Sequence, residues 1–378
     1  MAPAFPKNEY TSRQDRFRKE LERADLDLCV VTAPENVCYL TGHATPGYYT
    51  YQALVFPANG DPVLIMRESE LINAEESTWF KADQLTGYRD ELDPIEVTAQ
   101  VIRAAGKAER IGFDSRSWFL PPAPYQKLLE EVKPQETASI DAALGRLRLV
   151  KSAAEIESIR GAARIVNHAA RAAVEAIAPG VRERDVAAVM FDQMVREGSE
   201  FLGMEPFVAS GPRSGNIHAT WTDREIRNGE PVLIELAATR NRYHAVLMHT
   251  AQVGRLPDDL QQVADACARA RDATIAAMQP GASAQSCHEA CVGAIDADGL
   301  MEYYRKRTGY SVGIAFAPDW GEGGLLSLGY GETTPLEPGM VMHAVPAIRI
   351  PGRGGVGLSA TVLITEDGPE VLTRIDAP

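Results

Sequence analysis

No stretch of the 378-residue chain approaches the roughly 20 uninterrupted apolar residues that a membrane-spanning helix needs. The opening residues, MAPAFPKNEYTSRQDRFRKE, have no apolar run after their charges, so they lack the pattern of a secretory signal. Runs of lysine and arginine with interleaved aromatic residues are also missing, and the net charge is −14. These absences argue against a membrane partner and a nucleic-acid partner, and they predict a cytoplasmic location.

Cysteine is scarce, with five residues in the chain. Cys29 and Cys38 lie in apolar stretches, where reduced thiols usually pack as small hydrophobic side chains. Cys287, His288 and Cys291 share or border one face of a predicted helix. A zinc site needs about four ligands, and nothing nearby completes the set. We therefore interpret this trio as helix packing and predict no metal there.

Length and local pattern predict two domains, at 1–148 and 149–378. The first is expected to be a small α/β domain because strands and helices alternate. Its predicted elements are a helix over 11–25, a strand–turn–strand over 27–42 with its turn at 33–36, a hairpin over 53–66, and a helix followed by a strand over 97–114. The second domain begins sharply, because Ser152 and Glu155 form an S-x-x-E capping box before a long amphipathic run.

An internal repeat organises the second domain. Residues 179–198 and 280–299 each begin with Pro-Gly, continue through a polar N-cap region and a helix, and end with glycine. Each copy is followed by a strand that a glycine leads, at Gly229 and Gly339. Two copies of helix plus strand predict a pseudo-two-fold domain with a cleft between its halves. Chance similarity of two α/β units is the alternative.

Polar side chains gather in this second domain, and any that line the cleft are candidates for chemistry. They are His218, Trp221, Glu235, Tyr243, His244, His249, Tyr310, Asp319, Trp320, Glu322 and His343. Glu235 interrupts the apolar strand VLIEL, so it is either paired in the core or lines the cleft with a raised pKa. Each lone histidine is more often structural than catalytic, although several on neighbouring strands favour a site that works near neutral pH. A metal site would need several converging carboxylates, and these strands offer too few.

A glycine-rich loop at 307–324, RTGYSVGIAFAPDWGEGG, carries four of these residues. Glycine is kept where φ is positive or where backbone and side chain approach closely. The composition fits a binding loop and also a plain turn.

The whole chain resembles the creatinase/prolidase family, whose second domain has the pita-bread fold. The resemblance is carried by RLVKSAAEIESIR, by the duplicated helix–strand units, and by EPGMV and TVLITEDGPEVLT. It implies a mixed α/β (α+β) fold, with a small N-terminal α/β domain and a C-terminal pita-bread domain. Peptidases of this family bind two metal ions, and the five ligand positions correspond here to Glu235, Val246, Tyr310, Val345 and Ser359. Valine cannot ligate a metal, so the resemblance implies a metal-free branch without a cofactor.

Within that branch, HATWTDRE, RYHAVL and TGYSVGIAFAPDWGE are most similar to the ectoine hydrolases. The implied function is metal-independent hydrolysis of an amidine or guanidino C–N bond in a small amino-acid derivative, with a cyclic, ectoine-like compound as the first candidate. The implied catalytic residues are His218, Glu235, Tyr310 and His343. The implied substrate-binding residues are Tyr48, Tyr51, Trp221, Tyr243, His244, His249, Asp319, Trp320 and Glu322. A substrate carboxylate would bind Arg242, His249 or Arg349.

The resemblance also implies a homodimer in which the N-terminal domain, through Tyr48, Tyr51 and Gln52, reaches the active site of the partner. Two alternatives stay open. A lyase or another non-hydrolytic enzyme of a secondary pathway could use the same cleft, because Met248 and the stretch AIRIPGRGGVGLSA depart from the ectoine hydrolases. A non-catalytic pita-bread module that binds a peptide or protein is the other, and the retention of His218 with Glu235 speaks against it.

Overall fold

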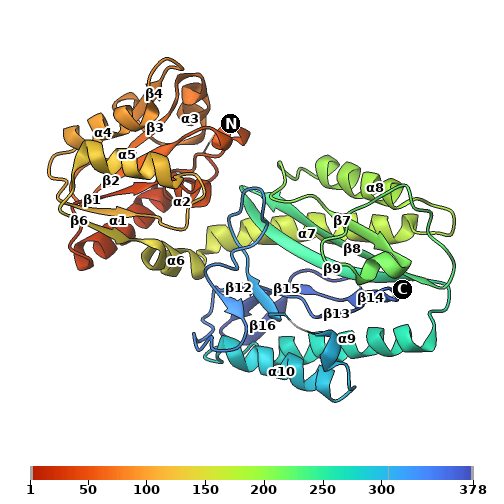
Figure 1. The fold of residues 1–378 in the computed structure, drawn as a ribbon. Coiled ribbons are helices and arrows are strands. Elements are labelled where there is room, and N and C mark those ends of the chain that lie inside the picture. The colour runs from red at the N-terminus through yellow and green to blue at the C-terminus, as the bar shows by residue number, and fades with distance from the viewer. Residues whose placement is uncertain (1–2, 305, 376–378) are drawn as a thin grey trace. The chain divides into compact units, whose positions relative to one another are not determined.

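A computed structural model describes residues 3–304 and 306–375. The chain divides into two compact units, residues 1–148 and 149–378 (Figure 1). Within the described ranges, no helix is both long and apolar enough to cross a membrane.

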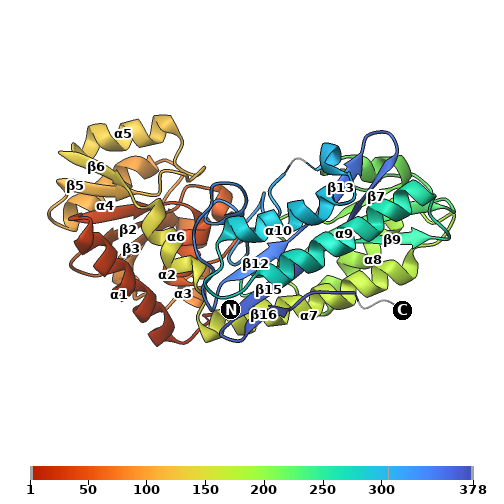
Figure 2. The ribbon, with the colours of Figure 1, turned by 90° about the horizontal axis from the view of Figure 1, so that it is seen from below.

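The N-terminal unit is built on a six-stranded mixed sheet in the order β4-β3-β2-β1-β5-β6. Its strands are β1 Leu28–Val31, β2 Ala53–Pro57, β3 Val63–Arg67, β4 Leu85–Tyr88, β5 Arg110–Phe113 and β6 Glu136–Ser139. Its helices are α1 Lys7–Arg23, α2 Pro34–Thr41, α3 Leu71–Ser77, α4 Pro94–Ala104, α5 Pro122–Val132 and α6 Asp141–Leu149. Helices α4 and α5 bury apolar residues on one face of this sheet, and α1 packs Phe17 on Phe56 from the other (Figure 2).

One element of this unit differs from the prediction. The segment after β1 forms helix α2, where a turn and a second strand were expected. Pro34 occupies the first turn of the helix, where its missing N–H costs nothing, and Gly42 ends the helix with φ 87°. Because nearly every residue of α2 is buried, its short apolar run carries no helical period that separates it from a buried strand.

The C-terminal unit packs helices on both sides of three small sheets, in the orders β7-β8-β9, β11-β10-β12-β15-β16 and β13-β14. Its helices are α7 Ala153–Ala176, α8 Glu183–Arg196, α9 Asp258–Ala277 and α10 Ala284–Asp296. Its strands are β7 Phe207–Ser210, β8 Glu230–Arg240, β9 Tyr243–Val253, β10 Gly309–Ser311, β11 Ser327–Leu328, β12 Val341–Ala344, β13 Ala347–Ile350, β14 Gly354–Gly357, β15 Ala360–Thr365 and β16 Gly368–Val371. Ser152 caps α7 through the predicted capping box with Glu155. Figure 1 shows α7 and α8 on one side of the strands and α9 and α10 on the other.

The predicted repeat is present in the backbone of this unit. The glycines before the two repeated helices and the two repeated strands all have positive φ, namely Gly180, Gly281, Gly229 and Gly339. The first two donate their N–H groups to equivalent carbonyls, those of Ile226 and Leu336, each three residues before the strand-leading glycine. Glu235 and Val345 each stand six residues after such a glycine, so they occupy equivalent places in the two halves.

Candidate active site

Glu235 lies in the middle of a row of paired residues across the β7-β8-β9 sheet. Phe207 on β7 and Met248 on β9 are its partners in register, so the three side chains share one face of the sheet. Met248 also belongs to an apolar cluster with Leu233, Val345 and Ala347, against which Tyr310 packs. We call these residues, together with Phe207 and Glu235, the Glu235 cluster.

The Glu235 carboxyl group is 6% exposed and sits in this apolar setting. Burial raises its pKa to about 7, against the opposing effect of the nearby cations Lys306 and Arg349. No hydrogen-bond donor among residues 3–304 and 306–375 reaches the carboxylate. Glu235 therefore exchanges a proton near neutral pH and keeps its oxygens available.

Two basic side chains stand beside Glu235. Lys306 donates a hydrogen bond from Nζ to the carbonyl of Val345, at 2.8 Å, and burial lowers its pKa to about 8. Arg349, on β13, donates from Nη1 to the carbonyls of Ser214 (2.8 Å) and Asn216 (3.1 Å). Lys306 was not among the predicted site residues, because nothing in a run of basic residues marks the member that lies near a buried acid.

Tyr310 belongs to a chain of hydrogen bonds that starts in the glycine-rich loop. Its hydroxyl accepts from Trp320 Nε1 at 2.9 Å and lies 3.0 Å from His343 Nδ1. His343 Nε2 lies 2.7 Å from Ser359 Oγ, which accepts the N–H of Met248. In the tautomer protonated at Nδ1, Ser359 donates its hydroxyl proton to Nε2, and His343 donates from Nδ1 to Tyr310. The hydroxyl proton of the partly exposed Tyr310 is left to point away from this chain.

The structure corrects the role predicted for His343. The ring is fully buried, both nitrogens are engaged, and burial lowers its pKa to about 3. His343 is a neutral support for Tyr310, and no ring nitrogen remains for a reacting carbon.

The glycine-rich loop uses its glycines for close approach. A Cβ on Gly321 would stand 2.5 Å from the Tyr310 ring, and one on Gly313 would stand 2.6 Å from the Glu322 carboxylate. Trp320 packs edge-on against Phe207 at 5.4 Å, which brings the loop to the Glu235 cluster. Asp319 is exposed and accepts the N–H of Gly321.

Glu322 also differs from its predicted contact with substrate. Its carboxylate lies 2.9 Å from Lys151 Nζ, and both side chains are 1% exposed. The pair ties the glycine-rich loop to the residue that precedes α7, so Glu322 orders the loop.

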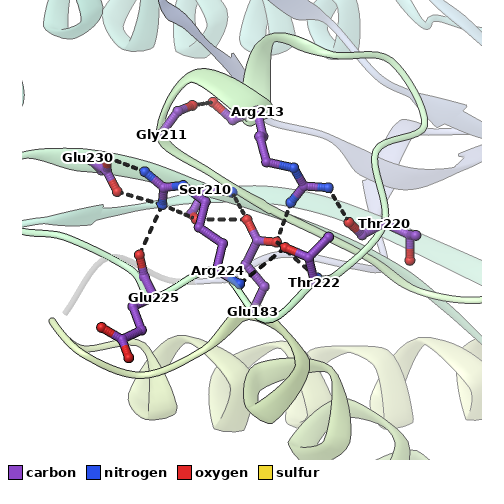
Figure 3. Close-up of polar contacts among 10 residues, drawn as sticks. Glu183, Ser210, Gly211, Arg213, Thr220, Thr222, Arg224, Glu225 and Glu230 are labelled. Atoms are coloured by element: carbon purple, nitrogen blue, oxygen red, sulfur yellow. Dashed lines mark hydrogen bonds and ion pairs between the residues drawn. The ribbon is translucent and has the colours of Figure 1, made fainter.

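His218 is exposed at the tip of the segment 211–222, between β7 and β8, with φ 56°. Its ring lies 5.7 Å from that of Phe207, the residue paired with Glu235. The segment is fastened by Glu183, a fully buried carboxylate in the first turn of α8. Figure 3 shows the bonds that it accepts: from the N–H and hydroxyl of Ser210, from those of Thr222, and from Arg213. One carboxylate thus holds both ends of the segment that carries His218.

The Glu183→Gln variant should loosen this segment and lower the free energy of unfolding by about 2 kcal/mol, because an amide NH2 group would face hydrogen-bond donors. Trypsin cleavage after Arg213 should become faster, and quenching of Trp221 fluorescence should increase. Glu225→Gln is the matched control, because its side chain is 61% exposed next to the same segment. Equal cleavage rates in Glu183→Gln and the native protein would contradict the assignment.

The remaining predicted residues of this unit lie apart from Glu235. Tyr243 is buried and donates its hydroxyl to Glu155 at 2.7 Å, so it is a core residue. His244 is buried beside the carbonyl of Arg242, which holds its Nδ1 at 3.0 Å, and burial lowers its pKa to about 3. Trp221 packs on Phe191 of α8 at 5.9 Å.

His249 was also predicted to contact substrate, and the register corrects this. It pairs with Ile234 and therefore points to the sheet face opposite Glu235. There it lines a pocket of about 270 Å³ that includes Arg271 and Arg374 and is also lined by Met248 and Ser359.

Two predicted residues lie in the N-terminal unit. Tyr51 packs in its core and its hydroxyl lies 2.9 Å from Thr98 Oγ1, while the Tyr48 ring lies 5.6 Å from that of Phe119. Their reach into the active site of a partner stays a prediction.

Comparisons with known proteins agree with this architecture. Residues 157–366 match the metallopeptidase family M24, and residues 13–150 match the creatinase/prolidase N-terminal domain. The ectoine hydrolase of Halomonas elongata is 29% identical over 97% of this chain and 96% of that protein. The probable dipeptidase PepE of Mycobacterium tuberculosis is 29% identical over 90% and 88%. The solved prolidase of Pyrococcus furiosus, 27% identical, covers 95% of this chain and all of its own, with a TM-score of 0.82. The chain therefore belongs to metallopeptidase family M24, a family of hydrolases, and carries the creatinase/prolidase domain on its N-terminal side.

Proposed function

We propose that this member of the family is a metal-independent hydrolase that cleaves an amidine or guanidino C–N bond in a small amino-acid derivative. The observation that carries the proposal is Glu235, a buried carboxyl group whose pKa is about 7 and whose oxygens accept no hydrogen bond from the described residues. A delocalised amidinium cation is the complement of such a group, because it can donate two hydrogen bonds to one carboxylate.

The metal that the family name implies does not fit the side chains at this point. Around Glu235 stand Leu233, Met248, Val345 and Ala347, which offer no hard oxygen or nitrogen ligand. Across the described part of the chain, no three His, Cys, Asp or Glu side chains group closely enough to hold a metal ion. A two-metal centre needs several carboxylates, so we derive no step through a metal.

The proposed reaction uses water, His218 and Glu235. His218 accepts a proton from water as the water oxygen attacks the amidine carbon. It then donates that proton to the leaving nitrogen as the C–N bond breaks. Glu235, as the carboxylate, balances the amidinium charge. Tyr310 donates a hydrogen bond at the reacting centre, with its orientation fixed by Trp320 and His343. Atoms and electrons balance without an oxidant or a cofactor.

Peptide-bond hydrolysis is the second candidate, because the relatives include a prolidase and a probable dipeptidase. A lyase in the same site and a non-catalytic binding module remain further alternatives. The proposed homodimer and cytoplasmic location are separate from this choice.

The test is an assay of chelator-treated protein, checked by elemental analysis, with ectoine, hydroxyectoine, creatine and a Gly-Pro dipeptide, followed by NMR. We expect turnover of an amidine or guanidino substrate that divalent metals do not increase. His218→Ala should reduce it by roughly 100-fold or more. His168→Gln, an exposed histidine on α7, is the control and should leave it unchanged. Turnover of the dipeptide alone, and only with added metal, would overturn the proposal in favour of a peptidase.

A further inference from the structure

Lys306 and Arg349 bring two positive charges to the site without acidic partners. Neither lies within ion-pair distance of a carboxylate in residues 3–304 and 306–375. Their hydrogen bonds go to backbone carbonyls, of Val345 for the lysine and of Ser214 and Asn216 for the arginine. Arg349 uses Nη1 for both of its bonds, so Nε and Nη2 remain for a ligand.

The other two residues predicted to receive a substrate carboxylate have other contacts. Arg242 is 2% exposed, lies over the rings of Phe201 and Phe316 at 3.7 and 4.6 Å, and donates to the carbonyls of Phe201 and Ala315. His249 points to the sheet face opposite Glu235, where it lines the pocket with Arg271 and Arg374. Of these three residues, Arg349 is the one that lies near Glu235.

We propose that Lys306 and Arg349 form the binding site for a carboxylate of the substrate, while Glu235 binds its cationic end. This inference rests on the proposed function, and it names the substrate class as a small zwitterion. Two partly buried positive charges beside one negative charge are unfavourable, and a ligand carboxylate would restore the balance. Arginine and lysine are the side chains that bind carboxylates most strongly.

The position of Arg349 supports this assignment. The guanidinium is fastened to the segment 211–222, two residues before His218, and this links the anion-binding group to the proposed base. Lys306 is fastened to Val345, which belongs to the Glu235 cluster. A ligand held at both ends would therefore lie across the surface that Phe207 and Tyr310 border.

A substrate carboxylate has two sources, a free amino-acid derivative or the C-terminus of a dipeptide. Calorimetric titration distinguishes them with ectoine, creatine and a Gly-Pro dipeptide as probes, each compared with its neutral carboxamide. The native protein should bind at least one carboxylate probe tenfold or more tightly than its carboxamide. Lys306→Met and Arg349→Met should each weaken binding of the carboxylate probe by roughly 10- to 100-fold and leave binding of the carboxamide probe nearly unchanged. Arg353→Met is the control, because Arg353 pairs with Asp259 on the surface.

Melting temperatures separate a binding role from a structural one. Since neither cation forms an ion pair with a carboxylate of the described residues, each variant should lose only its bonds to backbone carbonyls, and its melting temperature should fall by no more than a few degrees. Failure of every carboxylate probe to bind the native protein, or a carboxylate preference that survives in both variants, would overturn the proposal. Binding with this preference but without turnover would contradict the proposed reaction and leave the subsite standing. Turnover without a preference for the carboxylate probe would support the proposed reaction and contradict the carboxylate-binding site.

Discussion

Replacing Glu235 with glutamine is expected to reduce turnover by about 10²- to 10³-fold, the range typical for loss of one group that stabilises charge in the transition state. Glutamine keeps the shape of the side chain but cannot balance an amidinium. In the native protein, the carboxylate form is the active one, so the rate should rise with pH through about 7, where Glu235 loses its proton. Glu235→Gln should lack that rise.

The same substitution should stabilise the protein above neutral pH. The pKa of Glu235 is about 7 in the folded chain, against an ordinary value of 4.5, so folding favours the protonated form. The contribution of the Glu235 carboxyl group to the free energy of unfolding is fully present below about pH 4.5 and is lost as pH rises through about 7. The loss amounts to about 3 kcal/mol, which Glu235→Gln should recover at pH 8.

Urea unfolding of both proteins at pH 5 and pH 8 measures this difference, alongside the assay. Glu230→Gln, on the same strand, is the control with the opposite sign. Burial raises the pKa of Glu230, but its bonds with Arg224 and with the N–H of Arg227 outweigh burial and lower that pKa. That variant should lose stability at pH 8. A pH-independent difference between native protein and Glu235→Gln would show that Glu235 is not a buried proton-exchanging group.

Lys151→Met is expected to lower the free energy of unfolding by about 3 to 5 kcal/mol. The Lys151–Glu322 pair is 2.9 Å long, and both side chains are 1% exposed. Removing the lysine takes the 2.9 Å cationic partner from a buried carboxylate, which is costly because a buried charge cannot regain water. The glycine-rich loop should loosen first, since Glu322 lies within it.

The double variant Lys151→Met/Glu322→Gln should recover most of that loss, because no uncompensated charge remains. Urea unfolding of the native protein, both single variants and the double variant gives the coupling between the two residues. Additive losses would contradict a specific pair. A loss of activity at unchanged stability in Lys151→Met would instead return Glu322 to the substrate-binding role first predicted for it.

The fold class could be predicted from the sequence, because the repeat at 179–198 and 280–299 and the capping box at Ser152 are local patterns. The prediction that the chain has a small α/β domain followed by a pita-bread domain is confirmed. The contacts of individual side chains were harder to predict. Glu322 and Lys151 are 171 residues apart, and no periodicity links them.

The other differences between the predicted and the observed contacts at the site depend on which sheet face a side chain occupies and on whether it is buried. His249 and Met248 are neighbours on β9, yet alternation sends them to opposite sides of the sheet. His343 is polar and near Tyr310, as expected, but both of its nitrogens are already bonded. These outcomes depend on register and packing between distant segments, which composition and spacing leave open.

The duplicated architecture has a consequence for reaction geometry. Glu235 and His218 come from the first repeat, whereas Lys306 and Arg349 come from the second, in which Val345 occupies the place equivalent to Glu235. Under the proposal, two halves with one backbone plan thus contribute opposite charges to one ligand. A zwitterion would bind to these opposite charges in one orientation, with the same end always toward His218. The regiochemistry of bond cleavage would then follow from the different side chains that the two repeats carry.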